Sequence, residues 1–191
     1  MFKIISQDKK ARAGLLTTRT GEYETPFFMP VATKAAAKYT TVQNLEEIGF
    51  SAFIVNSFLV YLKPGLEVIK LHNGLHNFMG WKNCIFTDSG GFQILSLSKF
   101  KSKCDDKGLE FRSPFDGSLQ FLDPKKAIKI QQTLGSDVAM MLDHMPLYGK
   151  SEEEVLEATE RTHKWAKEAI DNRTKTKQLL FGIAQGGTFP Q

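Results

Sequence analysis

Residues 84–93, C-I-F-T-D-S-G-G-F-Q, are the stretch that decides the fold. A short apolar run ends at Asp88 and passes directly into a turn of small residues, Ser89-Gly90-Gly91. The pattern recurs in A-F-I-V-N at 52–56, D-V-A-M-M-L-D at 137–143 and L-L-F-G-I-A-Q at 179–185. Helical or loop segments separate the four runs, and this alternation is typical of a parallel α/β sheet.

Each of the four runs closes on a polar residue. These residues are Asn56, Asp88, Asp143 and Gln185. In parallel α/β folds the carboxyl ends of neighbouring strands line a single pocket, where catalytic groups collect. Two acids, a carboxamide and an asparagine in one pocket therefore predict a site for a polar, planar ligand.

The composition is that of an ordinary globular domain. The chain has 191 residues, of which 41% are hydrophobic and 24% charged, enough for one domain with a core. The formal net charge of +4 permits nucleic-acid binding without demonstrating it, and the nearest basic cluster is Lys99, Lys101 and Lys103. No signal peptide is recognisable and no apolar run approaches the ~20 residues of a membrane helix, so we expect a soluble cytoplasmic domain.

Start and stop signals place the remaining elements. We expect an antiparallel hairpin within residues 2–31, leading into a first inner strand F-F-M-P-V-A at 27–32. Helices are predicted from an N-cap at Thr40 or Thr41 to Gly49, after Pro64-Gly65, from Asp123-Pro124 to about Leu134, and from Ser151 to about Asn172. Residues 72–81 are predicted to form a loop, and 93–121 an inserted β-hairpin. Five βα-type strands result, which a barrel or a doubly wound sheet could contain.

The motif T-D-S-G-G-F-Q at 87–93 allows a functional and a structural interpretation. Two consecutive glycines after a strand let the backbone approach a ligand closely and offer amide donors. Asp88 could act there as a general acid/base, and Phe92 could stack on a planar ring. The alternative is a common tight turn with a capping aspartate.

Asp143 and Gln185 carry the same two interpretations. A carboxylate that ends a buried strand must be paired, ligand-bound or neutralised, unless it caps the next loop. Gln185 offers a carboxamide that donates and accepts, followed by the accessible backbone of Gly186-Gly187, or it belongs to a simple turn.

Residues that could bind a metal or a phosphate are scattered. The four histidines show no metal-ligand spacing, and Cys84 and Cys104 fit a reduced cytosolic protein better than a disulfide scaffold. Lys34 and Lys38 follow the first expected strand and could meet a phosphate or simply be solvated.

Seven ordered motifs resemble the tRNA-guanine transglycosylases (queuine tRNA-ribosyltransferases). They are T-P-F-F-M-P-V at 25–31, N-S-F-L-V-Y-L-K-P-G at 56–65, G-L-H-N-F-M-G-W at 74–81, T-D-S-G-G-F-Q-I-L-S-L at 87–97, F-D-G-S at 115–118, G-S-D-V-A-M-M-L-D at 135–143 and F-G-I-A-Q-G-G at 181–187. The motifs run through nearly the whole chain. Together they are far more specific than any one of them.

The resemblance implies a (β/α)8 TIM barrel that exchanges guanine in tRNA for a 7-deazaguanine, queuine or a precursor, in queuosine-type tRNA modification. Residues 1–191 would be the N-terminal part of this single domain, with about five of eight βα units, an N-terminal β-hairpin and a β insertion after the third strand. In the family an aspartate attacks the ribose, releases guanine and holds a covalent tRNA intermediate. The target base must leave its stack.

The resemblance also implies a role for each motif residue. Asp88 would be the general acid/base and a contact of the base, and Asp143 would read the amidine edge of the purine through two hydrogen bonds. Gln185 would contact the exocyclic oxygen, with Gly186 beside it. The adjoining pocket wall would consist of Ser89, Gly90, Gly91 and Phe92.

The chain departs from the family pattern in three places. The nucleophilic aspartate of the family and its structural zinc site, built from three cysteines and a histidine, have no counterpart among these residues, so no metal ligand or cofactor is expected in this chain. Leu59 replaces a histidine that is frequent in the family. We therefore expect the 191 residues alone to be inactive in base exchange.

The same departures leave three roles open. The chain could be the N-terminal part of an enzyme, a non-catalytic accessory subunit that binds tRNA, or one half of a split enzyme. Expected partners are tRNA, guanine, the deazaguanine base, and a homodimer mate or a chain supplying the rest of the barrel.

Overall fold

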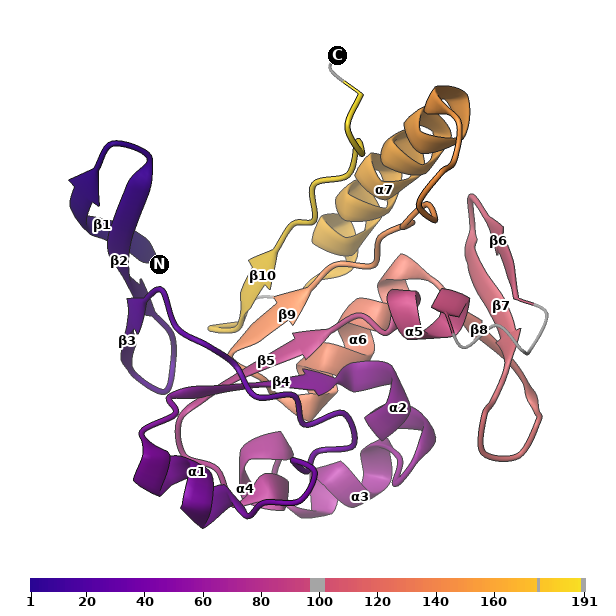
Figure 1. Cartoon of the computed structure of the whole chain (residues 1–191). Coiled ribbons are helices and arrows are strands. Elements are labelled where there is room, and N and C mark those ends of the chain that lie inside the picture. The colour runs from indigo at the N-terminus through magenta and orange to yellow at the C-terminus, as the bar shows by residue number, and fades with distance from the viewer. Residues whose placement is uncertain (97–101, 175, 190–191) are drawn as a thin grey trace.

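The computed structural model describes residues 1–96, 102–174 and 176–189. Its centre is a four-stranded parallel sheet in the order β10-β9-β5-β4 (Figure 1). The strands are β4 (Ala52–Asn56), β5 (Cys84–Asp88), β9 (Val138–Met140) and β10 (Leu179–Phe181). In the register of β4 and β5, Asn56 lies opposite Asp88, so both carboxyl ends are level. The predicted parallel α/β arrangement is confirmed.

Helices follow the strands. They are α1 (Val42–Ile48), α2 (Ser57–Leu62), α3 (Leu66–Leu71), α4 (Leu75–Met79), α5 (Gly91–Ser96), α6 (Pro124–Leu134) and α7 (Glu152–Asn172). Two of them begin at the predicted capping residue, and α1 begins at Thr41, one of the two residues proposed for its cap. The side chains of Thr41, Asp123 and Ser151 accept hydrogen bonds from the backbone N–H groups of the first turns of α1, α6 and α7.

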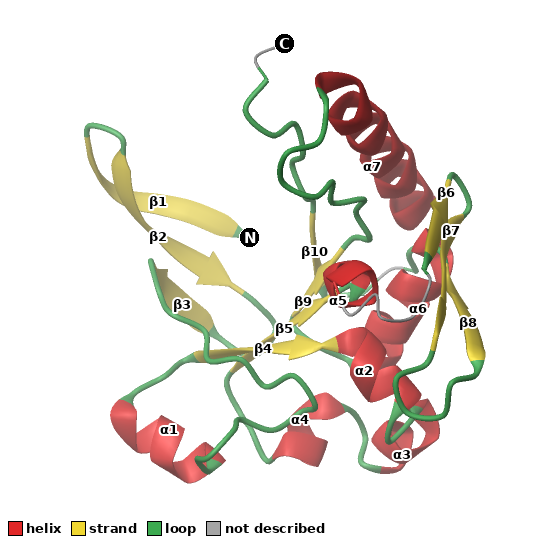
Figure 2. Ribbon diagram, turned by 45° about the vertical axis from the view of Figure 1, so that its right-hand side comes forward, coloured by secondary structure: helices red, strands yellow, loops and turns green. Residues whose placement is uncertain are grey.

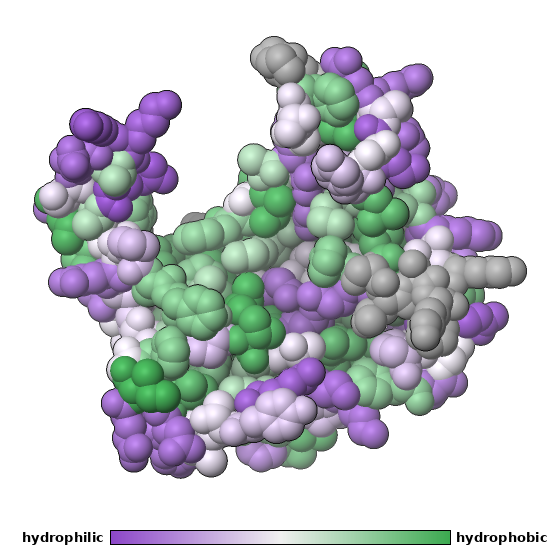
Figure 3. All heavy atoms as spheres, viewed as in Figure 1, coloured by the Kyte–Doolittle hydropathy of each residue, from purple (hydrophilic) through white to green (hydrophobic). Residues whose placement is uncertain are grey.

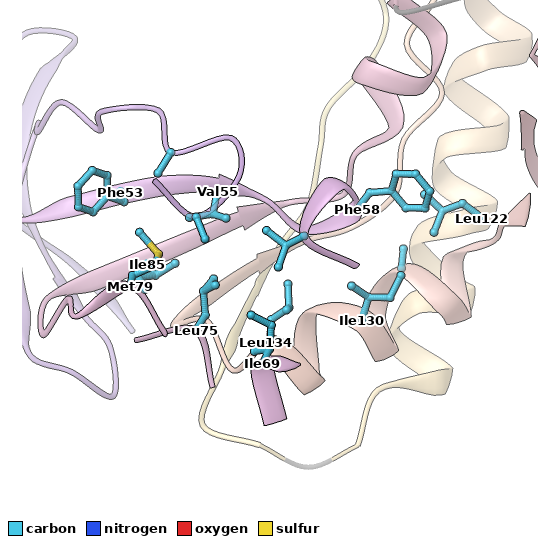
Figure 4. Packing of buried hydrophobic residues seen from close by; sticks show 14 of the residues in the cluster. Phe53, Val55, Phe58, Ile69, Leu75, Met79, Ile85, Leu122, Ile130 and Leu134 are labelled. Carbon is cyan, nitrogen blue, oxygen red and sulfur yellow. The ribbon is translucent and has the colours of Figure 1, made fainter. Parts of the chain in front are cut away.

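The main core lies between the sheet and the helices on one of its faces (Figure 4). Phe53 and Val55 of β4 and Ile85 of β5 are fully buried there. Side chains of α3, α4 and α6 close the layer, among them Ile69, Leu75, Ile130 and Leu134. Each such residue contributes about 1.5–3 kcal/mol through its removal from water, which holds the carboxyl rim of the strands in place.

Two small antiparallel sheets flank the parallel one (Figure 2). The first contains β1 (Phe2–Asp8), β2 (Ala11–Thr17) and β3 (Glu22–Thr25). The second contains β6 (Lys103–Asp105), β7 (Gly108–Arg112) and β8 (Leu119–Leu122), and it follows β5 and α5 in the chain. The N-terminal hairpin and the position of the insertion are confirmed, and each sheet has one strand more than a hairpin.

A buried carboxylate anchors the N-terminal sheet to the parallel one. Asp137 is fully buried directly before β9, and its oxygens lie 3.1 Å from Nε of Arg19 and 2.9 Å from Nε2 of His76. The N–H of Ile85 donates to it at 2.8 Å. Burial raises the pKa of Asp137, but these donors outweigh it, and the pKa is held below its ordinary value.

The predicted first inner strand is reduced to one bridge. Val31 pairs with Ile54 of β4 in parallel fashion, while the rest of residues 27–32 is irregular. Pro26 precedes the segment and Pro30 lies within it, and neither carries an N–H, so a continuous ladder cannot form there. The sheet therefore has four strands and a bridge at its β4 edge, where five strands were expected.

Four further predictions on secondary structure are wrong in detail. Residues 72–81, predicted as a loop, contain α4, because Leu75 and Met79 lie one turn apart and are buried. Residues 91–96, partly assigned to the insertion, form α5, and α2 was not predicted. β9 and β10 end at Met140 and Phe181, well before the ends of the predicted runs.

One face of the molecule is hollowed between the N-terminal sheet and α7 (Figure 3). Hydrophobic residues gather over much of its floor in this view. Large hydrophobic side chains also remain exposed along both edges of the parallel sheet, with Val31 62% exposed and Phe181 of β10 36% exposed.

Candidate active site

Asp88 stands at the carboxyl end of β5 with two hydrogen-bond donors on one oxygen. Nδ2 of Asn56, at the end of β4, donates to Oδ1 of Asp88 at 2.9 Å, and the N–H of Gly90 donates to the same oxygen at 2.9 Å. Burial raises the pKa of Asp88 to about 6, partly offset by these donors and reinforced by the charge of Asp143. A carboxyl group with that pKa can both give and take a proton near neutrality.

The turn that follows Asp88 is shaped by glycine. Gly90 has φ +83°, and a Cβ there would lie 2.3 Å from Cβ of Phe58. A Cβ on Gly91 would lie 3.3 Å from the backbone oxygen of Asp143. The turn is thus packed between α2 and the segment after β9, an approach that only glycine permits.

Ser89 and Phe92 differ in their surroundings. Ser89 is buried, and its Oγ accepts from the N–H of Gly91 at 3.4 Å. Phe92, on the first turn of α5, is 52% exposed. An exposed ring beside the turn is free to meet a ligand, and its stacking role stays a prediction.

Asp143 and Gln185 form a second polar pair. Nε2 of Gln185 donates to Oδ2 of Asp143 at 2.7 Å, which joins the segments after β10 and β9. Burial raises the pKa of Asp143, and the bond from Gln185 opposes this. Gly186 follows with φ +144°. Asp143 also raises the pKa of Asp88 through its charge, so the two pairs share one electrostatic environment.

The structure modifies the sequence-based placement of these residues. Asn56 ends β4 as expected, but its Oδ1 also accepts from the N–H of Leu59 and caps α2. Asp143 and Gln185 were predicted at strand ends and instead lie in the loops beyond β9 and β10. Loop positions after parallel strands still lie on the carboxyl side of the sheet, where ligand-binding residues of such folds collect.

Sequence reasoning missed the network beside Asp143. The N–H of His144 donates to Oγ1 of Thr162 at 3.0 Å, and Nη1 of Arg161 donates to Nδ1 of His144 at 2.9 Å. Because a guanidinium can only donate, the proton of a neutral His144 ring sits on Nε2. Burial and the Arg161 charge lower the pKa of His144. No pattern in the sequence signals this contact, because it depends on how α7 is rotated against the loop after β9.

The same face of α7 holds the tip of the insertion. Asp106 in the β6–β7 turn pairs with Nε of Arg161 at 3.1 Å and with Nζ of Lys164 at 2.9 Å. Nε1 of the buried Trp165 donates to the backbone oxygen of Asp106 at 2.9 Å. The insertion and the loop after β9 are therefore tied to one helix.

A cavity of about 320 Å³ lies between that loop, α5 and α7. His144 and Met145 line it, so it lies directly beside Asp143. Its other lining residues are Leu95, Ser102, Pro146, Leu147, Lys150, Glu154 and Glu157. The volume is sufficient for part of a small ligand.

Within the described residues, no three His, Cys, Asp or Glu side chains come together as a metal site. No helix in that part of the chain is long and apolar enough to cross a membrane.

Comparison with known proteins agrees with the motifs. The sequence model of the queuine tRNA-ribosyltransferase family matches residues 7–191. The chain is 50% identical to the "Queuine tRNA-ribosyltransferase" of Thermotoga petrophila over 189 residues, 99% of this chain and 51% of the relative. It is 44% identical to a protein of that name from Prochlorococcus marinus over 192 residues, covering 100% of this chain and 51% of the relative.

The chain spans about half the length of the curated relatives it matches. The family match nevertheless covers nearly all of its residues and includes every segment of the candidate site. The chain therefore belongs to the queuine tRNA-ribosyltransferase family.

Proposed function

We propose that this chain carries the base-recognition and acid/base part of a tRNA-guanine transglycosylase. The observation that carries the proposal is the pair of partly buried carboxylates, Asp88 with its pKa raised to about 6 and Asp143 bonded to Gln185. A purine that leaves ribose must gain a proton, and the incoming base must lose one, so the reaction needs a proton carrier near neutrality. Asp88 has that property.

The remaining roles follow from hydrogen-bonding chemistry. Asp143 accepts the two N–H groups of a guanine-type amidine edge, because an ionised carboxylate offers two acceptor oxygens in one plane. Gln185 then turns its amide N–H toward the exocyclic oxygen of the base, beside the open backbone of Gly186. Ser89, Gly90 and Gly91 form the wall, and Phe92 stacks on the ring.

We further propose that the four strands and the Val31 bridge are part of an eight-stranded barrel, with residues 1–191 as the N-terminal part of one domain. The attacking aspartate and the zinc of the family would come from residues outside these 191. The described residues offer no ligand set that fits zinc. Further chain, a homodimer mate or a separate subunit would complete the site, and base exchange by the 191 residues alone is not expected.

Equilibrium dialysis with radiolabelled guanine tests the proposal. Asp143→Asn leaves one acceptor oxygen and places an amide opposite a donor, which should weaken guanine binding by about 10- to 100-fold. Asp171→Asn, on the exposed last turn of α7, loses the same charge and should leave binding unchanged. Binding of tRNA without any binding of guanine would instead identify an accessory subunit and refute the enzymatic proposal.

A further inference from the structure

Three segments distant in the sequence meet around the ring of Phe115. Lys34 follows the Val31 bridge, Lys63 joins α2 to α3, and Phe115 lies in the turn between β7 and β8. Nζ of Lys34 lies 5.2 Å from the ring centroid and Nζ of Lys63 lies 5.9 Å from it. These residues are called the Lys34–Lys63–Phe115 cluster below.

The two lysines of the cluster and two further cations, Arg112 and Lys126, give this part of the molecule an excess of positive charge. Arg112 is exposed on β7, and Lys126 lies 4.9 Å from the ring centroid of Tyr61. None of these four cations belongs to an ion pair within the described part of the chain. Asp116 is the acid next to the ring, and its Oδ1 accepts from the N–H and the hydroxyl of Ser118.

The cluster lies on the carboxyl side of the parallel sheet, the same side as the candidate site. Phe58 connects the two, because it packs against Gly90 on one side and lies 4.9 Å from Phe111, ring centroid to ring centroid, on the other. Arg112 follows Phe111 directly. The candidate site and the cluster therefore share one packed layer of side chains.

Two ammonium groups at one aromatic ring repel each other, and the ring face compensates only part of that cost. An anion placed between them removes the repulsion. Phosphodiesters with an adjacent base match this arrangement in full, because cations take the phosphate and an exposed ring takes a base. Phe115 is 37% exposed and available for such a contact.

We propose that the Lys34–Lys63–Phe115 cluster binds the sugar-phosphate backbone of tRNA next to the guanine being exchanged. This inference rests on the proposed function and names the surface that holds the RNA strand. Of the two interpretations that the sequence left open for Lys34, phosphate binding is then the correct one, and Arg112 and Lys126 extend the path of the strand along the insertion and α6.

Fluorescence anisotropy with labelled, unmodified tRNA tests the inference, with the dissociation constant measured from 50 to 300 mM KCl. The double variant Lys34→Gln/Lys63→Gln removes two phosphate contacts. The slope of log K against log [salt] should become less steep by about 1.4–1.8. The loss of affinity relative to the unmodified chain should therefore be roughly 25- to 60-fold larger at 0.1 M salt than at 1 M salt.

The matched control is Lys82→Gln/Lys177→Gln. Both lysines are exposed and each lies two residues before a strand, β5 and β10, and thus on the opposite side of the sheet. The control has the same net charge as the Lys34→Gln/Lys63→Gln variant, and its salt slope should be no less steep than that of the unmodified chain. Phe115→Leu retains an apolar side chain but no ring face, and should weaken binding about fivefold or more.

Guanine dialysis on the same samples separates the two proposals. Guanine binding with equal salt slopes for both double variants overturns the inference and leaves the proposed function standing. The inference is likewise overturned if the unmodified chain binds guanine but no tRNA at 50 mM KCl. It is also overturned if the lysine variants alter the oligomeric state of the protein in sedimentation but leave tRNA binding unchanged. If the unmodified chain does not bind guanine, the proposed function itself is refuted.

Discussion

Replacing Asp88 by asparagine should stabilise the fold. Both hydrogen bonds to this side chain end on Oδ1, and within the described residues nothing donates to Oδ2. The amide oxygen of asparagine can accept the same two bonds from Asn56 and Gly90. The substitution therefore removes a partly buried charge while the local hydrogen bonding stays intact.

The magnitude follows from the pKa of Asp88, which burial raises from 3.8 to about 6. The difference corresponds to about 3 kcal/mol by which folding disfavours the ionised form. Because the folded pKa is the higher one, this cost is absent below pH ~3.8 and complete above pH ~6. Asp88→Asn should thus raise the free energy of unfolding by about 3 kcal/mol at pH 8 and by almost nothing at pH 4.

Urea unfolding followed by tryptophan fluorescence measures the effect, because Trp81 and Trp165 are both buried. With an m value of about 2–3 kcal/mol/M, the midpoint at pH 8 should rise by about 1 M. Asp171→Asn should leave the midpoint unchanged. An Asp88→Asn protein that is less stable at pH 8, or equally shifted at pH 4 and pH 8, would refute this account of Asp88.

Two further substitutions should destabilise the chain. Asp137→Asn weakens the buried contacts to Arg19 and His76 and should cost about 3 kcal/mol, measured by urea unfolding. Because the folded pKa of Asp137 is lowered, its stabilisation is present above its unfolded pKa and disappears as the pH falls through the folded one, so the deficit should shrink below pH ~4. Gly90→Ala places a Cβ 2.3 Å from Cβ of Phe58 at φ +83°. It should lower the free energy of unfolding by about 3 kcal/mol and abolish guanine binding. In the control Gly182→Ala the nearest atom is 3.8 Å away, and the free energy of unfolding should change by less than about 1 kcal/mol.

Elements with local determinants could be predicted from the sequence. Helices α1, α6 and α7 carry their own start signals, so Asp123 and Ser151 were identified correctly and the cap of α1 was placed at Thr40 or Thr41, of which Thr41 is the one observed. α4 has no such signal, since Gly74 supplies no side-chain cap, and burial of Leu75 by other segments decides its structure. Tertiary packing overrides local pattern in such short helices.

In the candidate site, too, some features follow from the local sequence and others depend on tertiary packing. That polar residues follow the strands could be predicted, because the order of strands and glycine turns is written along the chain. The pairing of Asn56 with Asp88 depends on the β4–β5 register, and that of Asp143 with Gln185 depends on loop paths across β9 and β10. The contact of Arg161 with His144 depends on the rotation of α7, which no local pattern specifies.

The contacts of the β6–β7 turn with α7 restrict the length that this turn can have. Loops at a protein surface usually accept insertions and deletions. Here Asp106 is held by three residues of α7, through both its carboxylate and its backbone oxygen. A single residue added or removed between Cys104 and Gly108 would displace all three contacts at once, so this hairpin tip is a surface loop whose length is as constrained as that of a core element.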